Sequence, residues 1–374
     1  MTKKIPFRKD IVGSFLRPQA LKDARAAFEK GRISARELKA VEDREIRILV
    51  EKEKANGLHD FTDGEFRRSF WHLDFLAALT GCEQVAAKAW SVHFEGKQPK
   101  ATTFRITGEL DFPEDHPFLA HFRFLKSLED EDHVAKMTIP SPSMLHLMTC
   151  VREENPKLPD LYAGKEDVLF QDIISTYRKA VKAFYDEGCR YLQFDDTSWG
   201  EFCSKEKTDA YRARGVDLEH IKRKYVEVLN EILRDKPEDL TITMHICRGN
   251  FRSTWFSSGG YEPVAEILFG SCHVDGFFLE YDSDRAGDFK PLRFINGQKV
   301  VLGLITSKTA ALENPEDLKA RIKEASAYVP LDHLCLSPQC GFASTEEGNI
   351  LTEEEQWAKI RLVCQVAEEV WQDA

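Results

Sequence analysis

The sequence has no hydrophobic run long enough to span a membrane, and its basic start lacks the apolar segment that export requires. No cluster of Lys and Arg stands out, and 52 basic against 63 acidic residues give a net charge of −11. Membranes and nucleic acids are therefore excluded as expected partners. No stretch rich in Pro, Gly or Ser divides the chain, and no internal repeat is visible.

A disulfide framework is also missing from the pattern of cysteines. Nine cysteines, an odd number, are scattered through 374 residues. Reduced thiols in the cytosol fit this usage better than cross-links, so we expect a cytoplasmic protein. Most of the nine, such as Cys189 and Cys364, lie in apolar periodic stretches and are expected to be small core residues.

Short apolar runs alternate with long helical patterns along the chain. Strands are predicted near residues 10–14, 58–64, 135–141, 189–195, 240–247, 274–280, 299–306 and 333–339. Helices are predicted at Ala35–Ala55, Glu166–Glu187, Leu218–Arg234, Pro315–Ala327 and Glu353–Gln372. Eight strand–helix units predict an α/β fold, a single (β/α)8 TIM barrel over residues 1–374. Hairpin-like alternation at about 81–130 predicts a β-hairpin-containing insertion after the second strand.

The most informative residues are His245 and Cys247, at the end of one apolar run. Residues i and i+2 of a strand point to the same face, so the imidazole and the thiol converge. Two later predicted strands end in Glu280 and Cys340, and active sites of this fold lie at the carboxyl ends of strands. The four residues form a plausible zinc ligand set. Each one alone also has an ordinary explanation, as a core thiol, a hydrogen-bonded imidazole or a solvated strand cap.

The types of ligand indicate which chemistry such a centre supports. Two thiolates and a carboxylate around Zn2+ leave a net charge of about −1, which makes the ion a poor Lewis acid for polarising a carbonyl. The ion can still bind a thiol, lower its pKa and keep the resulting thiolate nucleophilic. The sequence therefore predicts activation of a substrate thiol and alkyl transfer to its sulfur.

At these residues the chain resembles the catalytic half of cobalamin-independent methionine synthase. The resemblance implies a barrel in which His245, Cys247, Glu280 and Cys340 hold Zn2+, with homocysteine as methyl acceptor and methionine as product. The matching segments occur in the family's order and span nearly the whole chain: Val12-Gly13-Ser14-Phe15, Thr62-Asp63-Gly64-Glu65-Phe66, Gln193-Phe194-Asp195-Asp196, His245-Ile246-Cys247, Leu279-Glu280 and Ser337-Pro338-Gln339-Cys340-Gly341.

The same resemblance implies a binding site for the amino-acid part of the substrate. Ser14 and the backbone around Val12 would hold the carboxylate, whereas Glu65 and Asp195 would bind the ammonium group. Paired carboxylates suit a compact cation, and hydroxyl and N–H groups suit an anion. The ordinary alternative for the two acidic residues is salt bridging to neighbouring arginines.

Three departures from the family pattern concern the methyl donor. The chain carries no additional N-terminal barrel, and residues 141–148 lack the Trp that packs the pterin, although Glu201 matches a pterin-contacting glutamate. Thr306 stands at the position of the family's proton-donating His, and a hydroxyl cannot act as a general acid near neutral pH. His72 or His146 could supply the proton instead. Four aromatic residues are candidates for the wall of the donor cleft or for the core: Trp71, Phe75, Trp199 and Trp255.

These observations predict a zinc-dependent methyltransferase that forms methionine from homocysteine. The donor would be a methyltetrahydrofolate or another activated methyl compound, such as a methylcorrinoid protein, which needs no such acid. Small molecules are the expected partners. The sequence leaves assembly into a homodimer undecided. One alternative is a metal-independent decarboxylase of the porphyrinogen type, with Arg17, Arg248 and Arg252 holding substrate carboxylates. The other is a non-catalytic zinc- or thiol-binding protein.

Overall fold

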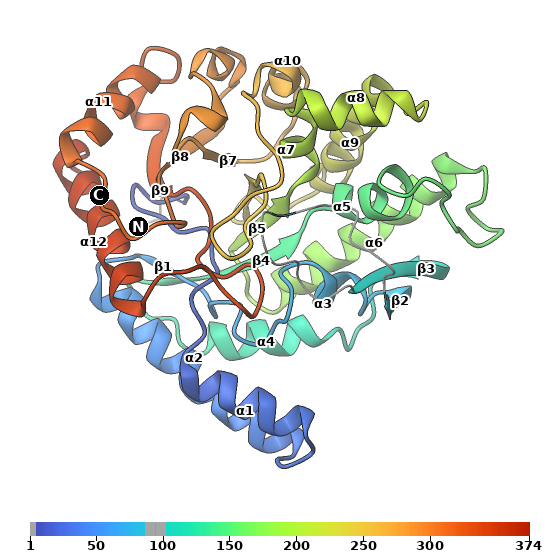
Figure 1. Ribbon diagram of the computed structural model, residues 1–374, viewed down its shortest axis with the longest axis horizontal. Helices are drawn as coiled ribbons and strands as arrows, with labels where there is room; N and C mark the ends of the chain where they lie inside the picture. Colours follow the sequence, from blue (N-terminus) through green and yellow to red (C-terminus); the bar gives the residue numbers. More distant parts are fainter. Residues whose placement is uncertain (1–4, 87–93, 95–101) are drawn as a thin grey trace.

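Seven parallel strands form one curled sheet at the centre of the protein, as the computed structural model shows for residues 5–86, 94 and 102–374 (Figure 1). Each strand is hydrogen-bonded in parallel to its neighbour. In spatial order the strands are β1 (Asp60–Phe61), β4 (Val134–Pro140), β5 (Tyr191–Asp196), β6 (Thr241–Ile246), β7 (Gly276–Glu280), β8 (Lys299–Ile305) and β9 (Leu334–Pro338).

The N-terminal segment lies between the two edges of this sheet and closes the barrel. Lys9 pairs in parallel with Leu336 of β9 on one side, and Ser14 pairs in parallel with Gly64, beyond β1, on the other. Backbone hydrogen bonds of 2.8 to 3.2 Å accompany both bridges. Residues 8–15 thus take the place of the first predicted strand, and the predicted barrel fold is confirmed.

Helices surround the sheet, and the five predicted ones are present as α2 (Ala35–Ala55), α6 (Glu166–Asp186), α9 (Leu218–Leu233), α11 (Pro315–Ala325) and α12 (Glu353–Val370) (Figure 1). Capping boxes at Ser34 and Thr352 begin α2 and α12. Within the described residues, no helix is both long and apolar enough to cross a lipid bilayer. The other helices are α1 (Gln19–Glu29), α3 (Leu73–Leu76), α4 (Pro117–Lys126), α5 (Pro142–His146), α7 (Ser198–Phe202), α8 (Lys205–Ala213), α10 (Glu262–Ser271), a π-helix (Leu147–Val151) and 3-10 turns at Asp284–Ala286, Lys290–Phe294 and Leu331–His333.

The interruption predicted at residues 81–130 contains two different features. β2 (Thr80–Ala86) and β3 (Thr102–Asp111) pair antiparallel in a separate two-stranded sheet. Helix α4, in contrast, contacts β4 and α6 and buries its apolar face, as an ordinary barrel helix does. The prediction wrongly placed α4 within the insertion. Residues 87–93 and 95–101 lie outside the described part of the chain.

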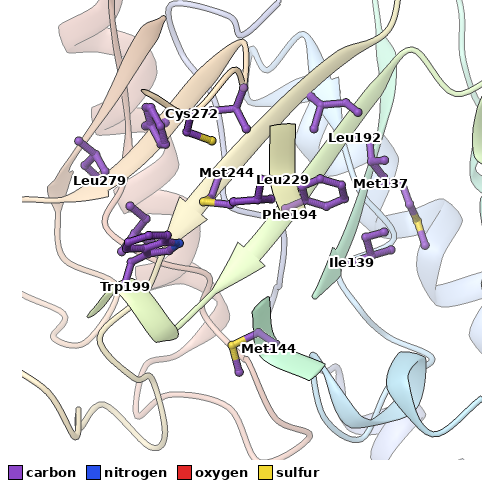
Figure 2. Close-up of a cluster of buried hydrophobic side chains, with 14 of the residues drawn as sticks. Met137, Ile139, Met144, Leu192, Phe194, Trp199, Leu229, Met244, Cys272 and Leu279 are labelled. Carbon is purple, nitrogen blue, oxygen red and sulfur yellow. The ribbon is translucent and has the colours of Figure 1, made fainter. Parts of the chain in front are cut away.

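Apolar side chains fill the space around the central strands and fix the positions of the strand ends (Figure 2). Met137 of β4, Phe194 of β5 and Met244 of β6 are almost completely buried. Trp199 and Phe75, two of the aromatic residues considered for the donor cleft, belong to this core and are fully buried. The rigid packing means that side chains at the carboxyl ends of the strands have little freedom to move.

A buried ion pair connects the closing segment with the sheet. Nζ of Lys136 lies 2.8 Å from Asp10 Oδ1 and 3.8 Å from Asp60 Oδ2, and all three side chains are 0% exposed. Lys136→Met should lower the free energy of unfolding by about 3–5 kcal/mol, because it leaves a buried carboxylate uncompensated. Urea unfolding measures this loss, and Lys39→Met, which breaks an exposed pair with Asp43, should cost less than about 1 kcal/mol. Equal stability of the two variants would contradict the prediction.

Candidate metal centre

Four side chains from the carboxyl ends of the strands converge on one point. His245 lies in β6 and Cys247 follows it, Glu280 ends β7, and Cys340 follows β9. One ligand atom from each residue can be chosen so that all four lie within 4.8 Å of one another, and all four residues are buried. The structure thus brings together the residues that the sequence indicated as metal ligands.

The donor atoms and their spacing fit a tetrahedral zinc ion. The Sγ atoms of Cys247 and Cys340 are 3.7 Å apart. Two thiolates that each lie about 2.3 Å from a tetrahedral zinc ion are separated by roughly 3.8 Å. Both ring nitrogens of His245 are buried and have no hydrogen-bond partner. A buried polar atom without a partner is strongly disfavoured, so this imidazole favours a bound ligand such as a metal ion.

The electrostatics of the cluster favour a bound cation. Burial alone would lower the pKa of His245, but the neighbouring Cys340, Asp195 and Glu280 raise it above the ordinary value for histidine. The contact with Cys247 lowers the pKa of Cys340 well below that of an ordinary thiol. Cys340, Asp195 and Glu280 thus place negative charge around the imidazole. A divalent ion satisfies the same negative groups.

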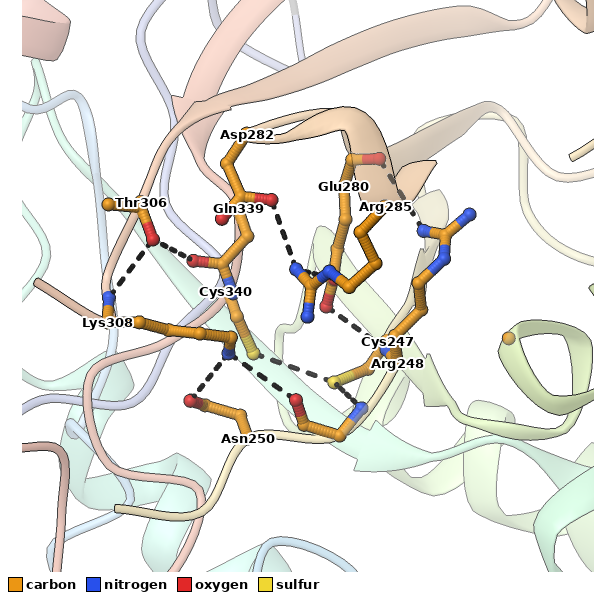
Figure 3. A network of polar contacts seen from close by, with 12 residues as sticks. Cys247, Arg248, Asn250, Glu280, Asp282, Arg285, Thr306, Lys308, Gln339 and Cys340 are labelled. Carbon is orange, nitrogen blue, oxygen red and sulfur yellow. Dashed lines mark hydrogen bonds and ion pairs between the residues drawn. The ribbon is translucent and has the colours of Figure 1, made fainter. Parts of the chain in front are cut away.

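The carboxylate of Glu280 is held by a second layer of contacts (Figure 3). Its Oε1 accepts a hydrogen bond of 3.1 Å from the backbone N–H of Arg248, and its Oε2 accepts one of 3.0 Å from Nη2 of Arg285. Arg285 also pairs with Asp282 at 3.1 Å. Such contacts orient a metal ligand. The sequence analysis did not identify Arg285, because a short turn after a strand leaves no periodic pattern.

The loop after β8 carries the position of the family's acid. Thr306 is absent from the pocket wall and has its Oγ1 3.5 Å from Gln339 Oε1. Two residues later, the buried ammonium of Lys308 donates to Asn250 Oδ1 at 3.0 Å and to the carbonyl of Gly249 at 3.4 Å (Figure 3). Lys308 was also missed by the sequence analysis, which aligned only the family's histidine position.

A pocket opens directly above the cluster. His245, Cys247 and Cys340 line it, together with Arg152 and an aromatic wall. Trp71, one of the aromatic candidates, is part of this wall, whereas the exposed Trp255 is not. The other aromatic side chains of the wall are Phe70, Phe94, Phe251 and Phe256. The pocket therefore joins a metal-competent polar end to an apolar end.

The residues proposed to bind the amino-acid part of the substrate line the same pocket: Val12, Ser14, Glu65 and Asp195. Oε1 of Glu65 lies 3.5 Å from Arg68, but its Oε2 is buried without a hydrogen-bond partner. Burial raises the pKa of Glu65 to about 7 and that of Asp195 to about 6. The salt-bridge alternative thus accounts for only one oxygen of Glu65. The other oxygen is available to a cation.

The backbone around Ser14 and Glu65 is tightly constrained. Glu65 has a φ of +60°, which is unusual for a residue other than glycine and typical of functional sites. Oγ of Ser14 accepts a hydrogen bond of 3.2 Å from the backbone N–H of Ala343. A Cβ atom at Gly341 would lie 1.9 Å from this Oγ and 3.0 Å from the Cβ and backbone N of Ser14, so a larger residue beside Cys340 would displace Ser14. These constraints fix the wall of the pocket next to the metal cluster.

Glu201 lies behind the pocket wall. It is fully buried, its Oε1 accepts from Nε of Arg152 at 3.1 Å, and its Oε2 accepts from the hydroxyl of Tyr211. The predicted contact of Glu201 with a pterin therefore has no support in this arrangement, in which Arg152 faces the pocket instead. The sequence match could not reveal this, because burial depends on residues distant in the chain.

The two histidines considered as substitute acids are poorly placed for that role. His72 lines the pocket, but burial lowers its pKa to about 3, which leaves it neutral at physiological pH. His146 lines a different pocket, where its Nδ1 lies 3.0 Å from the hydroxyl of Tyr225 and its Nε2 3.5 Å from Glu166. The structure therefore gives no support to either histidine as a substitute acid.

The arginines that a decarboxylase would need do not line the pocket. Nη2 of Arg17 donates to the carbonyl of Glu65 at 2.7 Å. Arg248 donates to the carbonyl of Gly259 at 2.8 Å and to the hydroxyl of Tyr261 at 2.7 Å. Arg17, Arg248 and Arg252 are all absent from the pocket wall. The geometry therefore gives the decarboxylase alternative none of these three arginines, and Arg152, which does line the pocket, is paired with Glu201.

Comparisons with known proteins agree with the fold. The family model described as the catalytic domain of cobalamin-independent synthase matches residues 7–369. The chain is 50% identical to the uncharacterized protein YxjH of Bacillus subtilis (strain 168), over 99% of this chain and 96% of that protein. The putative vitamin-B12 independent methionine synthase of Listeria monocytogenes has a similar structure, with a TM-score of 0.77, 44% identity and 98% coverage of both chains. A B12-independent methionine synthase from Shewanella sp. W3-18-1, solved in complex with selenomethionine, shares the fold with a TM-score of 0.72, 18% identity and 97% coverage of both chains.

Proposed function

Because the chain belongs to the family of cobalamin-independent synthase catalytic domains, we propose that it is a zinc-dependent methyltransferase that acts on homocysteine and forms methionine. One observation carries this proposal. The ligand atoms of His245, Cys247, Glu280 and Cys340 lie within 4.8 Å of one another, and three of these residues line the pocket. Zinc bound to these residues would lower the pKa of an incoming thiol and keep its sulfur nucleophilic.

The residues around the cluster would position the amino-acid acceptor. Glu65 and Asp195 would bind its ammonium group, since both carboxylates line the pocket and Oε2 of Glu65 has no other partner. Ser14 and the backbone near Val12 would hold its carboxylate. In the transfer, a bond forms between the sulfur and the methyl carbon while the bond to the donor breaks, and the donor keeps that electron pair.

We propose a methyltetrahydrofolate or another activated methyl compound as the donor. The aromatic wall, with Trp71 and Phe251, can accommodate a flat or apolar group. A folate that gives up its methyl group leaves as an amine anion, which is a poor leaving group unless its nitrogen is protonated. Thr306 and His72 are unsuited to donate that proton. A methylcorrinoid needs no such proton, which favours it among the activated donors.

A single assay tests the proposal. Zinc-loaded protein is incubated with homocysteine and, in separate reactions, with methyltetrahydrofolate (mono- and polyglutamate) and a methylcorrinoid, and methionine is measured by mass spectrometry. We expect about one equivalent of bound zinc and methionine from at least one donor. Less than about half an equivalent of zinc in carefully purified protein would contradict the metal assignment. Zinc without turnover on any donor would favour the non-catalytic zinc- or thiol-binding alternative.

A further inference from the structure

The charge of the proposed centre changes when a substrate thiolate enters it. Two cysteine thiolates and the carboxylate of Glu280 leave a net charge of about −1 around a divalent ion, and a further thiolate makes it about −2. All four ligand residues are buried. Uncompensated charge in a buried site is strongly disfavoured, so positive charge near the sulfurs should decide how well an anionic ligand binds.

The positive charge of Arg285, which contacts Glu280, is already offset by neighbouring carboxylates. Nη2 of Arg285 lies 3.0 Å from Glu280 Oε2 and 3.1 Å from Asp282 Oδ1. Two carboxylates therefore share one guanidinium, which leaves little positive charge for a further anion. The guanidinium of Arg248 packs over the ring of Tyr261 at 4.1 Å and donates to the hydroxyl of that tyrosine at 2.7 Å.

Lys308 differs from Arg285 because its ammonium contacts only neutral acceptors, and from Arg248 because its charge acts on both Cys247 and Cys340. It is 5% exposed and donates to Asn250 Oδ1 and to the carbonyl of Gly249. Among the described residues, no carboxylate lies within ion-pair distance of its Nζ. Its positive charge acts on Cys247 and Cys340 in the direction that stabilises their thiolate forms. Figure 3 shows the side chain extending across the site from the loop of Thr306 to Asn250.

A network of hydrogen bonds fixes the ammonium in place. Asn250 Oδ1 also accepts from Nδ2 of Asn349 at 2.9 Å, and the same Nδ2 donates to the carbonyl of Ser307 at 2.9 Å. The backbone N–H of Ser307 donates to Gln339 Oε1 at 2.7 Å. The loop that carries Lys308 is therefore tied to the loops that follow Cys247 and precede Cys340. Such a preorganised charge needs no rearrangement when a ligand arrives.

We propose that Lys308 is a positioning residue whose fixed ammonium offsets the negative charge that a substrate thiolate adds to the metal centre. The inference rests on the proposed function, since it takes a metal-bound thiol as the ligand. The proposal implies that the site distinguishes ligands by the charge on their sulfur atom. Homocysteine binds as a thiolate, and its thiol proton leaves to solvent, so its binding depends on Lys308. Methionine has a neutral thioether sulfur, so its binding does not.

The test measures the binding of both amino acids to zinc-loaded wild-type protein and to Lys308→Gln by titration calorimetry. The glutamine amide can still donate to Asn250 but carries no charge. Lys308→Gln should keep its zinc, bind methionine with unchanged affinity and lose homocysteine affinity by roughly 10- to 100-fold. Lys308→Arg should recover most of that loss. Lys308→Met provides a second neutral variant if the glutamine variant folds poorly.

The outcomes separate this inference from the proposed function. Equal losses for homocysteine and methionine would indicate a structural role for Lys308 and overturn the inference, and so would unchanged homocysteine binding in a neutral variant. Loss of zinc from all variants would overturn it as well, because Lys308 would then serve to hold the metal centre together. Wild-type protein that holds no zinc, or that binds neither amino acid, would overturn the proposed function itself and the inference with it.

Discussion

Replacing Cys340 with Ser is expected to remove zinc from the protein and to abolish methionine formation. A serine hydroxyl stays protonated at neutral pH and is a poor zinc ligand, so Cys340→Ser leaves only three donors. It also removes the group that most strongly raises the pKa of His245. We expect zinc to fall below about a tenth of an equivalent and turnover to fall by more than about 100-fold. Metal analysis after dialysis and the methionine assay measure the two effects.

Cys335→Ser is the matched control for this variant. Cys335 is also buried and lies in β9, five residues before Cys340, but its Sγ faces the carbonyl of Pro6 at 3.8 Å. It is outside the metal cluster. The control should therefore retain both zinc and activity. If Cys340→Ser also retained both, Cys340 would not be a ligand, and the metal assignment would have to be abandoned.

The barrel could be predicted from the sequence because its strands are buried on both faces. Such strands read as continuous apolar runs, and the runs before His245, Glu280 and Cys340 end close to where β6, β7 and β9 end. The metal cluster follows from this, since the carboxyl ends of parallel strands lie on one rim. The strand formed by residues 8–15 was also recognisable, although only isolated bridges connect it to its neighbours.

The remaining parts of the site depend on contacts that no local pattern records. Lys308 lies in an irregular loop and Arg285 in a three-residue 3-10 turn, where neither the strand period nor the helix period applies. Glu201 matches a short motif, yet Arg152 separates it from the pocket, and only the folded chain shows this. Helix α4 was missed because the hairpin-like alternation before it suggested that the interruption continued.

Glu65→Gln is expected to weaken the binding of the amino-acid ligand by about 2–3 kcal/mol, or roughly 30- to 150-fold. The carboxylate would form a charge-assisted contact with the ammonium group, and its Oε2 lacks any other partner. Methionine is the ligand of choice, because it has no thiol whose ionisation would complicate the result. Titration calorimetry at about pH 8 gives the affinities of the variant and the wild type.

The pH dependence of methionine binding identifies the group responsible. Burial raises the pKa of Glu65 to about 7, so this carboxyl becomes protonated as the pH falls from about 8 to about 6. A neutral carboxyl cannot pair with an ammonium group, and wild-type affinity should therefore fall by roughly tenfold over this range. Glu65→Gln should show a much flatter profile, in which the remaining change follows Asp195, whose pKa is about 6.

Glu42→Gln provides the control for this experiment. Glu42 is a largely buried carboxylate on α2 that pairs with Arg67 at 2.9 Å and does not line the pocket. It should leave both the affinity for methionine and its pH profile unchanged. If Glu65→Gln behaved like this control, Glu65 would serve only its contact with Arg68, as the salt-bridge alternative requires. The ammonium group would then depend on Asp195 alone, the other carboxylate that faces the pocket beside His245.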